Sequence, residues 1–154
     1  MPAGVLDVFR IFVFLGFIHL LMMLRTDMKH MKVDSRHNWF MMGVISVMFL
    51  SNYPGLLIVV GLTVIALTLG IILKKYSGIG DVEMGSWAII GFGVLNLSYT
   101  VIYLFWLVVL KTLYMIPMRR AKVTKLPGTP LFLGTFIITA ACAYFLELVM
   151  AAAV

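Results

Sequence analysis

Two of the acidic residues in this chain stand where acid–base chemistry is feasible. Asp27 follows the first long apolar run, which ends at Leu24, and Asp81 follows the turn Gly78-Ile79-Gly80. Glycine lets a chain unwind and lets a second strand approach closely. Two carboxylates that meet in a low-dielectric site share one proton, so that one activates a water and the other protonates a carbonyl or a leaving amine. If Asp27 and Asp81 meet, the sequence predicts hydrolysis by an acid pair.

Each of these residues also has a purely structural interpretation. Asp27 could be a solvated charge among basic neighbours, and Asp81 could cap the helix that follows the glycine turn. Asp34 is an alternative first acid. His30 and His37 flank the same basic loop, but loop histidines are usually solvated, so we predict no metal site and no cofactor.

The composition indicates a membrane protein. Of the 154 residues 63% are hydrophobic and only 12% are charged, with a mean hydropathy of +1.11. So few charges cannot cover a domain of this size in water. In lipid every backbone polar group must be satisfied within the protein, which leaves helices or a closed barrel. The apolar runs are continuous rather than alternating, so the sequence predicts helices.

The positive charges mark loops rather than a nucleic-acid surface. The formal net charge is +6, and no basic stripe with interleaved aromatic residues is present, so we predict no nucleic-acid partner. Basic residues gather in cytoplasmic loops of membrane proteins. Three clusters separate the apolar runs: Arg25, Lys29, Lys32 and Arg36; Lys74 and Lys75; Lys111, Arg119, Arg120, Lys122 and Lys125.

Turn signals divide the apolar runs into helices. The turn Ser51-Asn52-Tyr53-Pro54-Gly55 separates helices expected over about 39–50 and 56–73. The next charge-free stretch could form one long helix. A break at Asn96-Leu97-Ser98 would instead give two short ones, the second ending at Ile116, and would return the third basic cluster to the cytoplasmic side. The last run starts near Pro130.

We therefore predict an all-α fold, a single membrane-embedded domain over residues 1–154. It would be a polytopic bundle of about six transmembrane helices, some of them short or re-entrant, in the plasma membrane. Both termini would lie outside, and all three basic loops would lie in the cytoplasm. In this topology Asp7 and Glu147 fall at the outer face. The other four acids fall at the cytoplasmic edge.

Three motifs occur in the order in which one enzyme family has them. Thr26-Asp27-Met28-Lys29, followed by Val33-Asp34-Ser35-Arg36, resembles the first aspartate motif of type IV prepilin peptidases and archaeal preflagellin peptidases. Gly78-Ile79-Gly80-Asp81 resembles their glycine-x-glycine-aspartate motif. Leu126-Pro127-Gly128-Thr129-Pro130-Leu131, with Gly134 beyond, resembles the proline-containing entry to their last helix.

This resemblance implies a membrane aspartic endopeptidase with Asp27 and Asp81 as the catalytic pair. Its partners would be the lipid bilayer and pilin-like or flagellin-like precursor proteins. It would cut their short basic leaders at the cytoplasmic membrane edge. Gly78, Gly80, Pro127 and Pro130 would then be supporting motif residues. Asp34 and Glu83 could contact the basic leader.

The chain also departs from many bacterial members of that family. It has Asp34-Ser35 where they have proline and asparagine, and Glu83 where they have lysine. It lacks a cysteine-rich segment, since Cys142 is the only cysteine, so N-methylation is not predicted. The compact size resembles the minimal or archaeal branch. The competing hypothesis is a non-enzymatic protein: a small transporter or channel subunit, or an inactive relative of the peptidases.

Overall fold

The computed structural model is an all-helical bundle. It describes residues 3–30, 35–52, 61, 64–65, 68, 79–121 and 128–152. The helices with defined bounds are α1 (Ala3–His30), α2 (Ser35–Asn52), α4 (Ile79–Leu95), α5 (Leu97–Ala121) and α6 (Thr129–Ala152). The all-α prediction is therefore confirmed for the described part of the chain.

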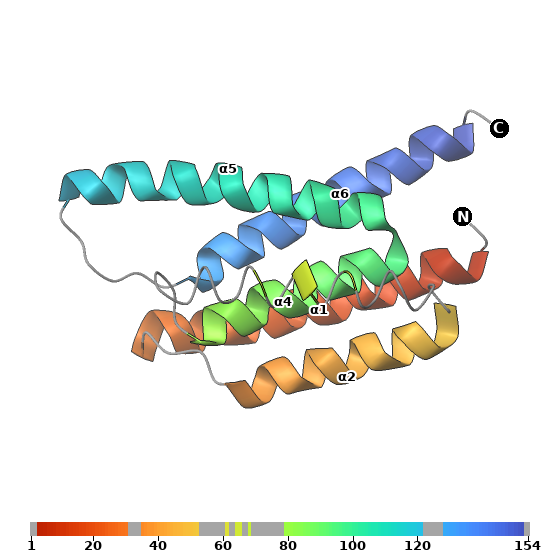
Figure 1. Ribbon diagram of the computed structural model, residues 1–154, viewed down its shortest axis with the longest axis horizontal. Coiled ribbons are helices and arrows are strands. Elements are labelled where there is room, and N and C mark those ends of the chain that lie inside the picture. The colour runs from red at the N-terminus through yellow and green to blue at the C-terminus, as the bar shows by residue number, and fades with distance from the viewer. Residues whose placement is uncertain are drawn as a thin grey trace.

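The five helices run up and down along one another (Figure 1). Helix α4 packs against both α2 and α5, α5 packs against α6, and α1 packs against α6 and α2. The end of α1 and the start of α6 lie at one end of the bundle, with the starts of α2 and α4 and the end of α5 (Figure 1). We call this the site end. The start of α1 and the end of α6 lie at the other end, which we call the terminal end (Figure 1).

Aromatic rings form the centre of the bundle where α1, α4, α5 and α6 meet. The ring centroid of Phe12 lies 5.3 Å from that of Phe92 and 5.7 Å from that of Phe136. The Trp87 centroid lies 5.6 Å from that of Phe136. Tilted and edge-on ring pairs at these distances are favourable beyond the area they bury. All four side chains are at most 1% exposed.

Two glycines let these rings approach the helix backbones. The Phe12 ring of α1 lies directly over Gly91 of α4, and the Phe136 ring of α6 lies over Gly16 of α1. A Cβ at either glycine would overlap the ring. Close backbone approach at small residues is how membrane helices gain packing energy, since lipid supplies no hydrophobic driving force between them.

Three helices are long and apolar enough to cross a membrane: Asp7–Met28, Leu97–Ile116 and Thr129–Ala152. The apolar parts of α2 and α4, Asn38–Met48 and Val82–Leu95, are shorter. The helix predicted over about 56–73 lies outside the described residues. The described part of the chain thus supports a membrane bundle with three full-length spans, while six spans stay a prediction.

Of the two possibilities for this stretch, the structure has the break after Leu95, but the second helix, α5, is not short, since it has 25 residues. The Asn96 amide N–H donates to the Phe92 carbonyl at 2.9 Å and closes α4. The Asn96 Oδ1 atom accepts the Ser98 N–H at 3.0 Å and caps α5. The buried Thr100 hydroxyl donates to the Ile89 carbonyl at 3.0 Å and ties the two helices together.

Two predicted helix ends were wrong. The first helix does not stop at Leu24 but continues to His30, so Asp27 lies inside α1. Helix α5 continues through Pro117 to Ala121 instead of ending at Ile116. The first end was placed by hydropathy, which detects where apolar side chains stop, whereas a helix continues through charged residues, most of which form helices well. The second was placed by Pro117, but membrane helices tolerate an internal proline.

We predict that Gly91→Ala destabilises the bundle, because the added methyl group overlaps the Phe12 ring. Overpacking of this kind costs about 1–3 kcal/mol. Gly43→Ala is the matched control, since a Cβ there meets nothing within 4 Å. Thermal unfolding in detergent should show a lower midpoint for Gly91→Ala and an unchanged or higher one for Gly43→Ala. Equal midpoints for the two variants would contradict this account of the packing.

Candidate functional site

Asp27 is a buried carboxylate held by one threonine. Its side chain is 3% exposed. Its Oδ2 atom accepts the backbone N–H of Thr129 at 2.9 Å and the Thr129 hydroxyl at 2.8 Å. Thr129 itself is fully buried. The predicted site residue of α1 is therefore joined directly to the first residue of α6, which stands 102 positions later in the chain.

The start of α6 explains why an acid is held here. The Gly128 carbonyl accepts the first helical hydrogen bonds, from the N–H groups of Leu131 and Phe132. The N–H groups of a first helical turn have no partner within the helix. Pro130 has no N–H that needs a partner. Thr129 donates its own N–H to Asp27. A carboxylate at a helix N-terminus is also favoured by the helix dipole.

The start of α4 and the end of α5 reach the same place. The Met84 sulfur of α4 lies 3.9 Å from the Thr129 hydroxyl oxygen. Tyr114, near the end of α5, lies within electrostatic range of Asp27. Asp81 stands three residues before Met84 in α4, about 4.5 Å along the helix axis. The backbone of Asp81 thus lies within a turn of a residue that contacts Thr129. Its side chain lies outside the described part.

A second polar cluster lies beside the first and joins α1, α2 and α4. The His19 Nε2 atom lies 3.2 Å from Asn38 Oδ1, and the Asn38 Nδ2 group donates to Glu83 Oε2 at 3.2 Å. His19 and Asn38 are buried, and Glu83 is half-buried. An amide oxygen only accepts, so His19 carries its proton on Nε2 in this arrangement. The ring of Trp87 packs edge-on against His19, with centroids 5.6 Å apart.

The other predicted site residues are only partly described. Gly80 and Asp81 are the second and third residues of α4, so the alternative in which Asp81 precedes and caps that helix is wrong. Pro130 is the second residue of α6. Gly78, Pro127 and Asp34 lie outside the described residues.

Asp7 and Glu147 make polar contacts at the terminal end. Asp7 pairs with Arg10 across one turn of α1 at 3.6 Å, with both side chains largely exposed. The hydroxyl of Tyr99, at the start of α5, donates to the Glu147 carboxylate of α6. Asp7 and Glu147 are thus separated from Asp27 and Glu83 by the length of the bundle.

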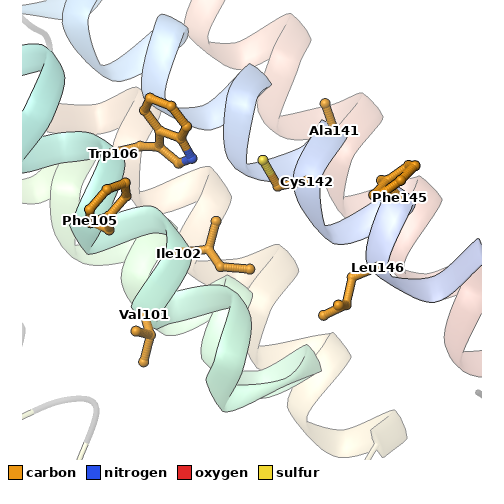
Figure 2. Close-up of a pocket in the computed structure, with 8 residues that line it drawn as sticks. All are labelled: Val101, Ile102, Phe105, Trp106, Ala141, Cys142, Phe145 and Leu146. Carbon is orange, nitrogen blue, oxygen red and sulfur yellow. The ribbon is translucent and has the colours of Figure 1, made fainter. Parts of the chain in front are cut away.

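Apolar grooves lie between the helices. Figure 2 shows one of about 670 Å³ between α5 and α6, near the terminal end. Its lining is almost entirely apolar and includes Cys142 and Trp106. A smaller groove of about 420 Å³ lies nearer the site end, with Tyr114 and Pro130 in its wall. None of the grooves described here carries a carboxylate.

Comparisons with models of protein families, with curated proteins and with solved structures found no match. The chemistry of the site must therefore be judged from its residues. Among the described residues no group of three or more His, Cys, Asp or Glu side chains could hold a metal ion. The arrangement offers a buried, oriented carboxylate, and a second acid begins a helix nearby. A buried, oriented carboxylate is one component of acid–base chemistry, and a second acid beside it would be the other.

Sequence reasoning missed Thr129, Asn38 and His19. Thr129 stands within the last quoted motif, but its bond to Asp27 joins distant parts of the chain. For His19, one feature of the sequence indicated that it has a polar partner. It interrupts the apolar run of the first span, and an ionisable residue inside a membrane helix is normally paired.

We predict that Thr129→Val destabilises the protein more than Thr139→Val. Both threonines are fully buried. Thr139 bonds the Thr135 carbonyl of its own helix, at 2.8 Å, whereas Thr129→Val deprives a buried carboxylate of a donor. That loss costs about 1–3 kcal/mol. Unfolding of both variants in detergent measures the difference. In an Asp27→Asn background the extra cost of Thr129→Val should shrink, and an unchanged cost would show that the Asp27 charge does not matter.

Proposed function

We propose that this protein is a membrane aspartic endopeptidase, with Asp27 and Asp81 as its catalytic pair. The observation that carries the proposal is the Asp27–Thr129 arrangement. Two hydrogen bonds to Oδ2 fix the plane of the carboxylate, so Oδ1 is left to orient a water. Asp81, at the start of α4, would hold the second position and donate a proton to the substrate carbonyl or the leaving amine.

The substrate class follows from the resemblance and from the position of the pair. Pilin-like or flagellin-like precursors carry a short basic leader before an apolar helix. The pair belongs to the end of the bundle, which we assign to the cytoplasmic membrane edge. Cutting would therefore occur where the leader meets the helix. The apolar part of the precursor would pack laterally among membrane helices, because packing rather than charge drives such association.

One observation favours the competing hypothesis. Asp27 supplies the first residue of α6 with a hydrogen-bond acceptor, and that role alone would justify a buried acid. An inactive relative, or a transporter or channel subunit, would keep this bond, and Asp81 would have no catalytic role in it. The two hypotheses therefore differ in what Asp81 does.

The decisive experiment mixes purified protein with a candidate precursor and reads the new N-terminus by mass spectrometry. Asp27→Asn and Asp81→Asn should each reduce cleavage by about 10²-fold or more, because an amide cannot shuttle a proton. Asp27→Asn should keep its fold, since the amide oxygen still accepts both bonds from Thr129. Asp7→Asn is the matched control at the terminal end and should cleave normally. Cleavage retained in both site variants would reject the acid pair.

A substitution at Glu83 tests whether this residue recognises the basic leader. Glu83→Gln removes the charge but keeps an oxygen that can accept from Asn38. If Glu83 attracts a basic leader, this variant should raise the KM for the precursor in low salt. The effect should fade at high salt, where the screening length falls to about 3 Å at 1 M. A precursor whose leader lysines and arginines are replaced by glutamine should show no such difference. A KM that is unchanged in low salt would remove Glu83 from leader recognition.

A further inference from the structure

The polar cluster beside Asp27 joins the two helices that carry the proposed catalytic acids. His19 belongs to α1, as Asp27 does, and Glu83 belongs to α4, as Asp81 does. Asn38 of α2 bonds both of them, through Oδ1 to His19 and through Nδ2 to Glu83. Glu83 stands two residues after Asp81, about 3 Å along the helix axis.

Farther along the two helices, described contacts between α1 and α4 are made by aromatic rings. The Phe12 ring lies on Gly91, near the other end of α4, and Trp87 packs against Phe12 and His19. Apolar packing is non-directional, so a small slide of one helix along the other costs little if the rings can follow. A hydrogen bond, in contrast, is lost when its donor and acceptor atoms move apart by more than a few tenths of an ångström. The cluster at Asn38 is therefore a directional contact between these helices at the site end, beside the one that Thr129 makes with Asp27 and Met84.

We propose that Asn38 is a positioning residue that fixes α4 against α1 and so sets the separation of Asp27 and Asp81. This inference rests on the proposed function for its catalytic consequence, but the geometric part stands independently. Asn38 itself does not touch the reacting atoms. A buried amide with an acceptor on one side and a donor on the other suits this role, because it fits only one arrangement of its two partners.

The test exchanges donor and acceptor between positions 38 and 83. Asn38→Asp places a carboxylate against the Glu83 carboxylate and removes the donor, so it should break the bond. Asn38→Asp combined with Glu83→Gln restores it with the polarity reversed. The new amide at position 83 donates, and the new carboxylate at position 38 accepts from it and from His19. The double variant has the same net charge as the parent.

Cleavage kinetics give the first readout. Asn38→Asp and Asn38→Leu should lower kcat about 100-fold, since a misplacement of about 1 Å costs that much. The KM for the precursor should stay close to the parent value. The double variant should recover most of the lost kcat. A purely structural role would instead lower the amount of folded protein, which thermal unfolding measures separately, and would leave kcat per folded molecule unchanged.

A distance measurement gives the second readout and needs no activity. Spin labels at Arg25→Cys of α1 and Ser86→Cys of α4 would be placed in a Cys142→Ala background. All three positions are exposed or half-buried. The label distance should shift in Asn38→Asp and return in the double variant. If that happens while the parent cleaves no precursor, the positioning inference holds and the proposed function fails. A parent-like distance and kcat in Asn38→Leu would overturn the inference.

Discussion

The site end of this protein depends on one buried interaction, the pair of hydrogen bonds that Thr129 donates to Asp27. Two needs meet there. The first N–H of α6 has no partner in its own helix, and a buried carboxylate requires donors. An unpaired N–H group or an unpaired carboxylate would each cost free energy in a low-dielectric interior. Met84 of α4 contacts the same threonine, so α1, α4 and α6 converge on one polar contact.

Ring packing and hydrogen bonds constrain the arrangement of the helices in different ways. The aromatic rings at the centre decide which helices are neighbours, and Gly16 and Gly91 decide how closely they approach. Such packing tolerates small displacements along the helix axes. The hydrogen bonds tolerate only much smaller displacements. They occur at both ends of the bundle, with Asp27 and Asn38 at the site end and Tyr99 with Glu147 at the terminal end.

Much of the helical organisation could be predicted from local sequence. A break at Asn96 was one of two possibilities, because a polar turn residue interrupts an apolar run there, and the last apolar run was placed near Pro130, close to the start of α6 at Thr129. The end of α1 was misjudged because hydropathy reports a membrane edge, not a helix end. The sequence also selected Asp27, but it could not supply Thr129, which lies 102 residues away. A pairing over that distance is decided by packing. The encounter of Asp27 with Asp81 stays a prediction.

The long separation of Asp27 and Thr129 has a consequence for biosynthesis. A chain enters the membrane in the order in which it is translated. At 5–20 residues per second, Thr129 emerges about 5–20 s after Asp27. During that interval the Asp27 carboxylate lacks both of the donors that Thr129 supplies. The candidate site is therefore completed only when α6 docks. A nascent or truncated chain that lacks α6 would hold Asp27 without the bonds that orient it, so the site could not form before the bundle does.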